Sequence, residues 1–174
     1  MAVRLTDPVI ITLLAYRHVL SAMGWLGGAL LTAFVISPRL QTVTLQSRLE
    51  FLAKAMPGLV RFIIGMIIGT FVFGLLLLFG LANGDMSLLA PTTPFGLAIS
   101  AGVALAAIAG IVGLAISVLS FNKIIAIAQE TLKSGQTPPQ PEMMKYSMRA
   151  RRGTTLVAVL LLGVLLMMVV AGFY

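Results

Sequence analysis

Residues 154–173 read TTLVAVLLLGVLLMMVVAGF, a run without a single charged side chain. A helix rises about 1.5 Å per residue, so about 20 apolar residues cross the roughly 30 Å hydrocarbon core of a bilayer. Three further apolar stretches have a comparable length, which gives expected spans at about 9–37, 59–82, 95–121 and 154–173. The chain is therefore expected to cross a membrane four times.

The composition of the whole chain agrees with that prediction. Hydrophobic residues make up 59% of the 174 positions and charged residues only 10%, with a mean hydropathy of +1.06. A soluble domain carries roughly 25% charged residues, which build a surface that faces water. We therefore expect an all-α, polytopic integral membrane protein with one domain, residues 1–174, folded as a four-transmembrane-helix bundle in the lipid bilayer.

An interfacial amphipathic helix is predicted inside the polar segment 39–57. Its four apolar positions recur every three or four residues: Leu45, Leu49, Leu52 and Met56. This pattern is typical of a short helix that lies in the membrane interface. Because proline interrupts helices, we expect Pro57–Gly58 to end this helix, and the first span to end at Ser37, before Pro38.

Basic residues are distributed unequally between the segments that join the spans. Ten of the 12 lie in or next to the segments 38–58 and 122–153, and the other two are Arg4 and Arg17. Because basic residues are enriched in cytoplasmic segments, both segments are expected in the cytoplasm and both termini outside, in a multi-pass protein of the cell membrane. The basic run 149–152 is expected to attract anionic headgroups. Since the basic residues flank apolar spans, nucleic acid is not expected as a partner.

Small residues recur at every fourth position in three of the spans. In lipid, helices associate through close approach of their backbones, so these positions are expected to pack helices of this chain together rather than to pair two chains. The positions are Gly24 and Gly28, Gly65 and Gly69, and Ala98, Gly102, Ala106 and Gly110.

Groups that could catalyse a reaction are scarce in this sequence. No Asp or Glu lies within the four apolar cores, and no nucleotide-binding loop, catalytic triad or metalloprotease motif occurs. Proton relays and ion-coupled transporters usually need ionisable groups inside the membrane. The chain has no cysteine, which excludes iron–sulfur clusters and thiolate metal sites. We therefore expect no enzymatic activity from this chain alone.

The first span carries the polar side chains that remain as candidates for a site. His18, Ser21 and Trp25 are spaced by three and four residues and so share one helix face. His18 and Arg17 are expected near the outer interface, where the imidazole could bind a metal or a haem iron. The alternative is that Arg17 and His18 are interface residues and that Trp25 is a packing residue.

His18 is the only histidine of the chain, so a second ligand would have to be of another kind. A methionine thioether can ligate a haem iron opposite histidine, and it also suits Cu(I). Met23 and Met66 are the nearest methionines in principle. The cofactor candidates are thus His18, Arg17 and Trp25, and the metal candidates are His18 and Met23.

Residues 18–28 read HVLSAMGWLGG, in which a histidine precedes Trp-x-Gly-Gly by one or two helical turns. This stretch resembles the opening helix of the copper-resistance protein D (CopD)-like superfamily of membrane proteins. Pro38, the segment 56–61 and the basic start of the last span are compatible with that family. The resemblance implies a four-helix unit that handles copper or binds a b-type haem. The further histidines that would complete such a site are missing from this chain.

Two functional hypotheses follow from the sequence. In the first, the chain is a non-catalytic accessory or structural subunit of a larger multi-subunit membrane complex, built on a CopD-like scaffold, with other membrane subunits as partners. In the second, the chain is a CopD-like protein that binds copper or haem b through His18. The small size and the few polar groups favour the first hypothesis, and the histidine motif favours the second.

Overall fold

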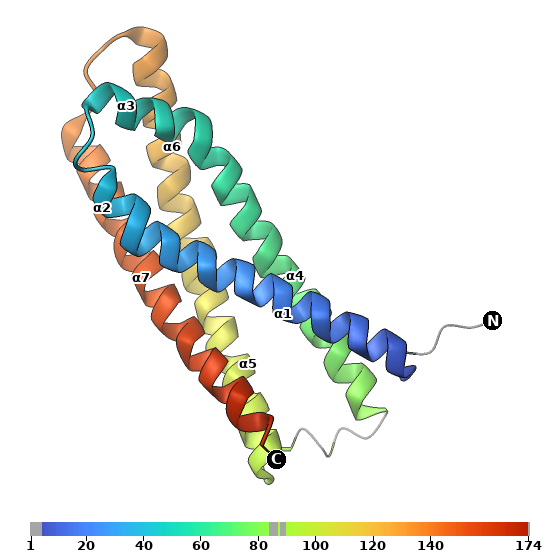
Figure 1. Cartoon of the computed structure of the whole chain (residues 1–174). Helices are drawn as coiled ribbons and strands as arrows, with labels where there is room; N and C mark the ends of the chain where they lie inside the picture. Colours follow the sequence, from blue (N-terminus) through green and yellow to red (C-terminus); the bar gives the residue numbers. More distant parts are fainter. Residues whose placement is uncertain (1–4, 84–86, 88–89, 174) are drawn as a thin grey trace. The chain divides into compact units, whose positions relative to one another are not determined.

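The computed structural model describes residues 5–83, 87 and 90–173, and within them the chain forms helices and no strand. The expected fold class is confirmed, because the chain is all-α with four helices long and apolar enough to cross a membrane (Figure 1). These helices are Pro8–Arg39, Leu45–Ala82, Pro94–Ser134 and Gln140–Ala171. Arg4, one of the two basic residues expected outside the cytoplasm, is not among the described residues.

Short π-helical stretches divide three of these helices into labelled segments. The first helix consists of α1 (Pro8–Leu30), η1 (Leu31–Ile36) and α2 (Ser37–Arg39). The second consists of α3 (Leu45–Glu50), η2 (Phe51–Ala55) and α4 (Met56–Ala82). The third consists of α5 (Pro94–Val112), η4 (Gly113–Val118) and α6 (Leu119–Ser134), and the fourth is α7 (Gln140–Ala171).

Two prolines that were expected to end helices lie inside continuous helices. The first helix continues through Pro38 and the second through Pro57, so the predicted boundaries at Ser37 and at Pro57–Gly58 are wrong. In both cases a π-helical stretch ends two residues before the proline. A π-helical turn holds more residues than an α-helical turn, which relieves the clash between the proline ring and the carbonyl one turn earlier.

The carbonyl that Pro57 leaves without its usual donor is bonded by another helix. Proline has no N–H, so Pro57 cannot form the α-helical hydrogen bond to the carbonyl of Ala53. The Nε2–H of Gln129 in α6 donates to that carbonyl at 3.3 Å. A side chain from a neighbouring helix thereby satisfies the backbone, which is one way in which membrane helices tolerate proline.

The connection between α6 and α7 is short. Gly135 ends α6 in the left-handed region, with φ of 68°, and its N–H donates to the Thr131 carbonyl at 3.0 Å. α7 begins at Gln140 and has Pro141 in its first turn, where a missing N–H has no helical partner to lose. The basic segment 145–152 is therefore helical and continuous with the fourth predicted span.

The chain divides into two compact units, each of which takes a part of all four long helices. Unit 1 comprises Met1–Leu26, Gly65–Ile108 and Leu160–Tyr174. Unit 2 comprises Gly27–Ile64 and Ala109–Val159. The polar side chains singled out in the first span belong to unit 1, and most of the basic residues belong to unit 2.

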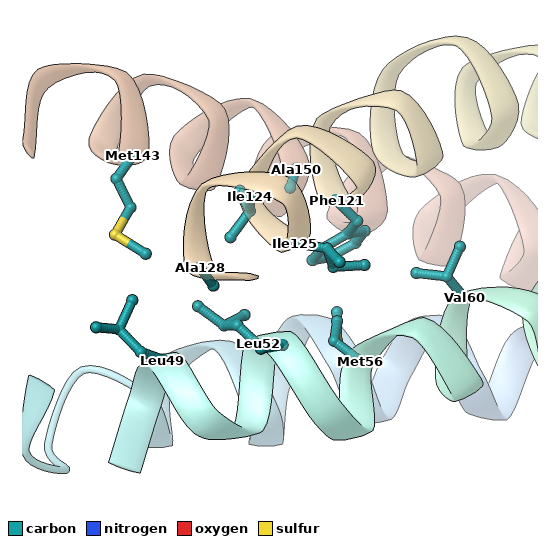
Figure 2. Close-up of a cluster of buried hydrophobic side chains, with 11 residues drawn as sticks. Leu49, Leu52, Met56, Val60, Phe121, Ile124, Ile125, Ala128, Met143 and Ala150 are labelled. Atoms are coloured by element: carbon teal, nitrogen blue, oxygen red, sulfur yellow. The ribbon is translucent and has the colours of Figure 1, made fainter. Parts of the chain in front are cut away.

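Unit 2 contains a cluster of large apolar side chains, here called the core cluster (Figure 2). In the close-up, one row of side chains from the second helix points toward a row from α6. The rows are Leu49, Leu52, Met56 and Val60, and Phe121, Ile124, Ile125 and Ala128. Met143 and Ala150 of α7 complete the cluster with Ala53. The apolar stripe predicted for segment 39–57 is therefore present, and most of it packs against α6.

Candidate functional site

The candidate site is the place in unit 1 where the polar face of α1 packs against α4. Three residue pairs form this α1–α4 contact: His18 with Thr70, Ser21 with Gly69, and Trp25 with Phe71. Since all three side chains of α1 reach the same helix, the prediction that they share one face is confirmed. This face of α1 was predicted from the sequence, but its packing against α4 was not.

His18 is held by a hydrogen bond to the backbone of α4. Its Nδ1–H donates to the carbonyl of Thr70 at 2.9 Å, and the ring is partly buried. A carbonyl oxygen can only accept, so the proton must be on Nδ1. In the neutral ring this leaves the lone pair on Nε2. Metal-binding histidines commonly have this arrangement, with the other ring nitrogen bonded to a carbonyl.

Gly74 makes the room that the imidazole needs. A Cβ added at Gly74 would lie 2.8 Å from both Cε1 and Nδ1 of His18, closer than real Cβ contacts allow. Five residues earlier, a Cβ at Gly69 would lie 2.6 Å from Oγ of Ser21. The two glycines therefore let the α1 side chains reach the backbone of α4, as close helix packing in lipid requires.

Two aromatic rings of α4 also contact side chains of α1. Trp25 is 1% exposed, and its ring centroid lies 6.1 Å from that of Phe71, with the planes tilted by 50°. Arg17 is exposed, and its guanidinium carbon lies 5.6 Å from the centroid of the Phe73 ring, a cation–π distance. Trp25 thus packs in the interior, while Arg17 lies at the rim of the contact.

The methionine that was predicted as a metal candidate does not join His18. Met23 is 66% exposed, and five residues along a helix turn it by about 140° from His18. Met66 is partly buried on α4, and its carbonyl accepts a hydrogen bond from the hydroxyl of Thr70 at 2.8 Å. Across residues 5–83, 87 and 90–173, no three His, Cys, Asp or Glu residues gather as a metal site.

Neither of the two α4 residues that hold His18 was predicted from the sequence. Thr70 supplies the carbonyl and Gly74 supplies the space, and they are four residues apart, so they lie on one face of α4. A pair of small residues at this spacing is the same signal that marked Gly65 and Gly69. The signal could have identified the face, but it could not have named His18 as its partner.

The small residues predicted for helix packing have different surroundings. Ala98, Gly102, Ala106 and Gly110 are all buried. In unit 1, a Cβ at Gly102 would collide with the end of the Met168 side chain in α7. In unit 2, a Cβ at Gly28 would lie 3.1 Å from Ile63. Gly24 is partly buried, and Gly65 is exposed with no atom within 4 Å of an added Cβ.

Compared with known proteins, the chain matches no family model, no curated protein and no solved structure. The resemblance of residues 18–28 to CopD-like proteins therefore stays a prediction.

Proposed function

We propose that the chain is a non-catalytic accessory subunit of a larger membrane complex, built on a CopD-like scaffold. The observation that carries this proposal is the hydrogen bond from His18 to the Thr70 carbonyl, in the space left by Gly74. Together with Ser21 and Trp25, His18 uses the polar face of α1 to fix one helix on another. A histidine engaged in packing supports a structural role for the motif.

The outer surface of the helices supports the same proposal. In the most apolar window of Leu45–Ala82, 11% of the positions are buried within the chain, against 28–33% in the other three helices. Most of this apolar surface therefore needs cover from lipid or from the helices of other subunits. An accessory subunit requires a surface of this kind, since helix–helix contacts in lipid use apolar and small side chains.

A specific observation favours copper or haem binding as the second candidate function. Because Nδ1–H of His18 donates to a carbonyl, Nε2 of the neutral ring keeps the lone pair that a copper ion or a haem iron would need. His18 is the only histidine, so such a site would take its other ligands from Met side chains or from another chain.

Purification from the native membrane in a mild detergent tests both functions. The wild-type chain is expected to elute with other chains in a fixed stoichiometry, without a Soret band and without bound copper. His18→Asn is the informative variant, because its amide keeps an N–H donor near the position of Nδ1 and has no ring nitrogen for a metal. We expect His18→Asn to assemble like the wild type and His18→Ala to be recovered in lower amount.

Two outcomes contradict the accessory role. One is a chain that elutes alone at the size of a monomer in its micelle. The other is a Soret band or bound copper in the wild type that both His18→Ala and His18→Asn abolish, which would establish the copper or haem function instead.

We also propose that the protein lies in the cell membrane with the segments 38–58 and 122–153 in the cytoplasm. The concentration of basic residues in and beside these segments supports this orientation. The chain has no cysteine, so a single introduced cysteine is the only site at which a maleimide labels this chain. A maleimide that cannot cross membranes should label Thr92→Cys in intact cells and Thr137→Cys only after permeabilisation. The reverse pattern would invert the orientation.

A further inference from the structure

A groove of about 690 Å³ runs along α7 beside η4 in unit 2. Three basic side chains of α7 alternate along the lining with Met144 and Met148, after Pro141, and beyond Arg152 the lining is apolar. The basic side chains are Lys145, Arg149 and Arg152, and the apolar ones include Met148, Leu156 and Ile116. The three basic residues are spaced by four and three positions, so they lie on one face of α7.

The three basic side chains of the groove place like charges close together. Side chains four residues apart on a helix are neighbours, and like charges at that spacing repel each other. None of the residues that line the groove is acidic. Lys145, Arg149 and Arg152 are all exposed. A bound anion would relieve this repulsion and would match the charge of the lining.

The apolar end of the groove begins where the last predicted span begins. Leu156 is exposed, and with Ile116 of η4 it continues the groove into the uncharged stretch 154–173. Gly153 brings the two helices close together here, because a Cβ added to it would lie 2.7 Å from Oγ of Ser117 and 2.9 Å from Cγ2 of Ile116. The lining of the groove therefore changes from basic to apolar at the point of α7 where the last predicted span begins.

We propose that this groove binds one anionic phospholipid. Its phosphodiester group lies against Lys145, Arg149 and Arg152, and one acyl chain follows Ile116 and Leu156. From Arg152 to Leu156 the lining changes from charged to apolar, as a phospholipid does from its headgroup to its acyl chains, whereas a free phosphate ion would leave this apolar part unused. The inference goes beyond the accessory role and does not depend on it, since an isolated chain would bind the lipid equally well.

Native mass spectrometry of the full chain tests this site. The protein is purified in detergent and mixed with equal amounts of phosphatidylglycerol and phosphatidylcholine, and the retained lipid is measured. The test variant is Lys145→Gln/Arg149→Gln/Arg152→Gln. The control variant, Lys123→Gln/Lys133→Gln/Arg151→Gln, removes the same charge from exposed positions of α6 and α7 that do not line the groove.

We expect the wild type and the control variant to prefer phosphatidylglycerol strongly. Each basic residue near an anionic lipid contributes about fivefold in affinity, so the test variant should lose on the order of a hundredfold of that preference. The single substitution Arg149→Gln should lose about fivefold. If the triple variant has an altered circular dichroism spectrum and is therefore misfolded, the single variant Arg149→Gln still tests the proposal.

Three results would overturn the proposal. The first is an equal loss of preference in the test and control variants, which would indicate attraction by net charge alone. The second is equal retention of phosphatidylcholine and phosphatidylglycerol by the wild type. The third is displacement of the lipid by millimolar inorganic phosphate, which would identify a phosphate site without a role for the apolar part.

Discussion

The core cluster of unit 2 and the α1–α4 contact of unit 1 join helices by different means. In the core cluster, large side chains such as Met56 and Phe121 fill the space between the second helix and α6 (Figure 2). In the α1–α4 contact, glycines of α4 leave the space in which His18 donates its hydrogen bond and Ser21 approaches closely, and Trp25 packs against Phe71. The core cluster depends on large side chains, whereas the α1–α4 contact at His18 and Ser21 depends on the space that glycines leave for them.

The solvent around each region explains the difference. α6 carries exposed charged residues, among them Lys123, Glu130 and Lys133, so one of its faces is built for water. Where water is present, burial of large apolar side chains stabilises a contact. The part of α4 that meets α1 is uncharged and would lie in lipid, where apolar burial contributes little. Close backbone approach and polar contacts then have to hold the helices.

The largest expected effect comes from emptying the core cluster. Met56 is 1% exposed, so Met56→Ala leaves a cavity and should lower the free energy of unfolding by about 2 to 5 kcal/mol. The matched control is Met23→Ala, because Met23 is 66% exposed and should lose less than about 0.5 kcal/mol. Equilibrium unfolding in increasing mole fractions of dodecyl sulfate measures both. Equal losses would show that the core cluster is not a distinct packed region.

The next effect comes from filling the α1–α4 contact. Gly74→Ala places a methyl group against the His18 ring and should displace the hydrogen bond to Thr70, with a loss of about 1 to 3 kcal/mol. Gly65→Ala is the control on the same helix, because an added Cβ there meets nothing. Alanine favours helix over glycine, so Gly65→Ala should be neutral or stabilising by up to about 1 kcal/mol. A neutral Gly74→Ala would mean that the α1–α4 contact tolerates added volume.

The sequence predicted those parts of the molecule that depend on local pattern. The four apolar helices follow from runs of hydrophobic residues, and the shared face of His18, Ser21 and Trp25 follows from their spacing. The partner of that face could not be predicted, because Thr70 lies 52 residues from His18. Helix spacing says which side chains lie together on one helix, but it does not say which other helix they meet.

The continuation of the second helix through Pro57 was missed for the same physical reason. From local pattern alone, a proline after an amphipathic stretch predicts a helix end. The structure offsets the missing N–H with a donor from Gln129, which is 76 residues away from Ala53. A side chain distant in sequence thus allows the helix to continue past a proline, and the contribution of Gln129 to this continuation can be measured.

The smallest expected effect tests this dependence with a double-mutant cycle. Gln129→Ala removes the donor to the Ala53 carbonyl and should lower the free energy of unfolding by about 1 kcal/mol. Pro57→Ala restores a backbone N–H that can form the α-helical bond to the same carbonyl. In that background Gln129→Ala should have a clearly smaller effect, with a coupling energy of about 0.5 to 1 kcal/mol.

Asn122→Ala, at an exposed position of α6, controls for loss of an amide and should have the same small effect in both backgrounds. If Gln129→Ala has the same effect with proline or alanine at position 57, Gln129 does not compensate for the proline, and the helix continues through Pro57 because of the π-helical stretch η2 alone.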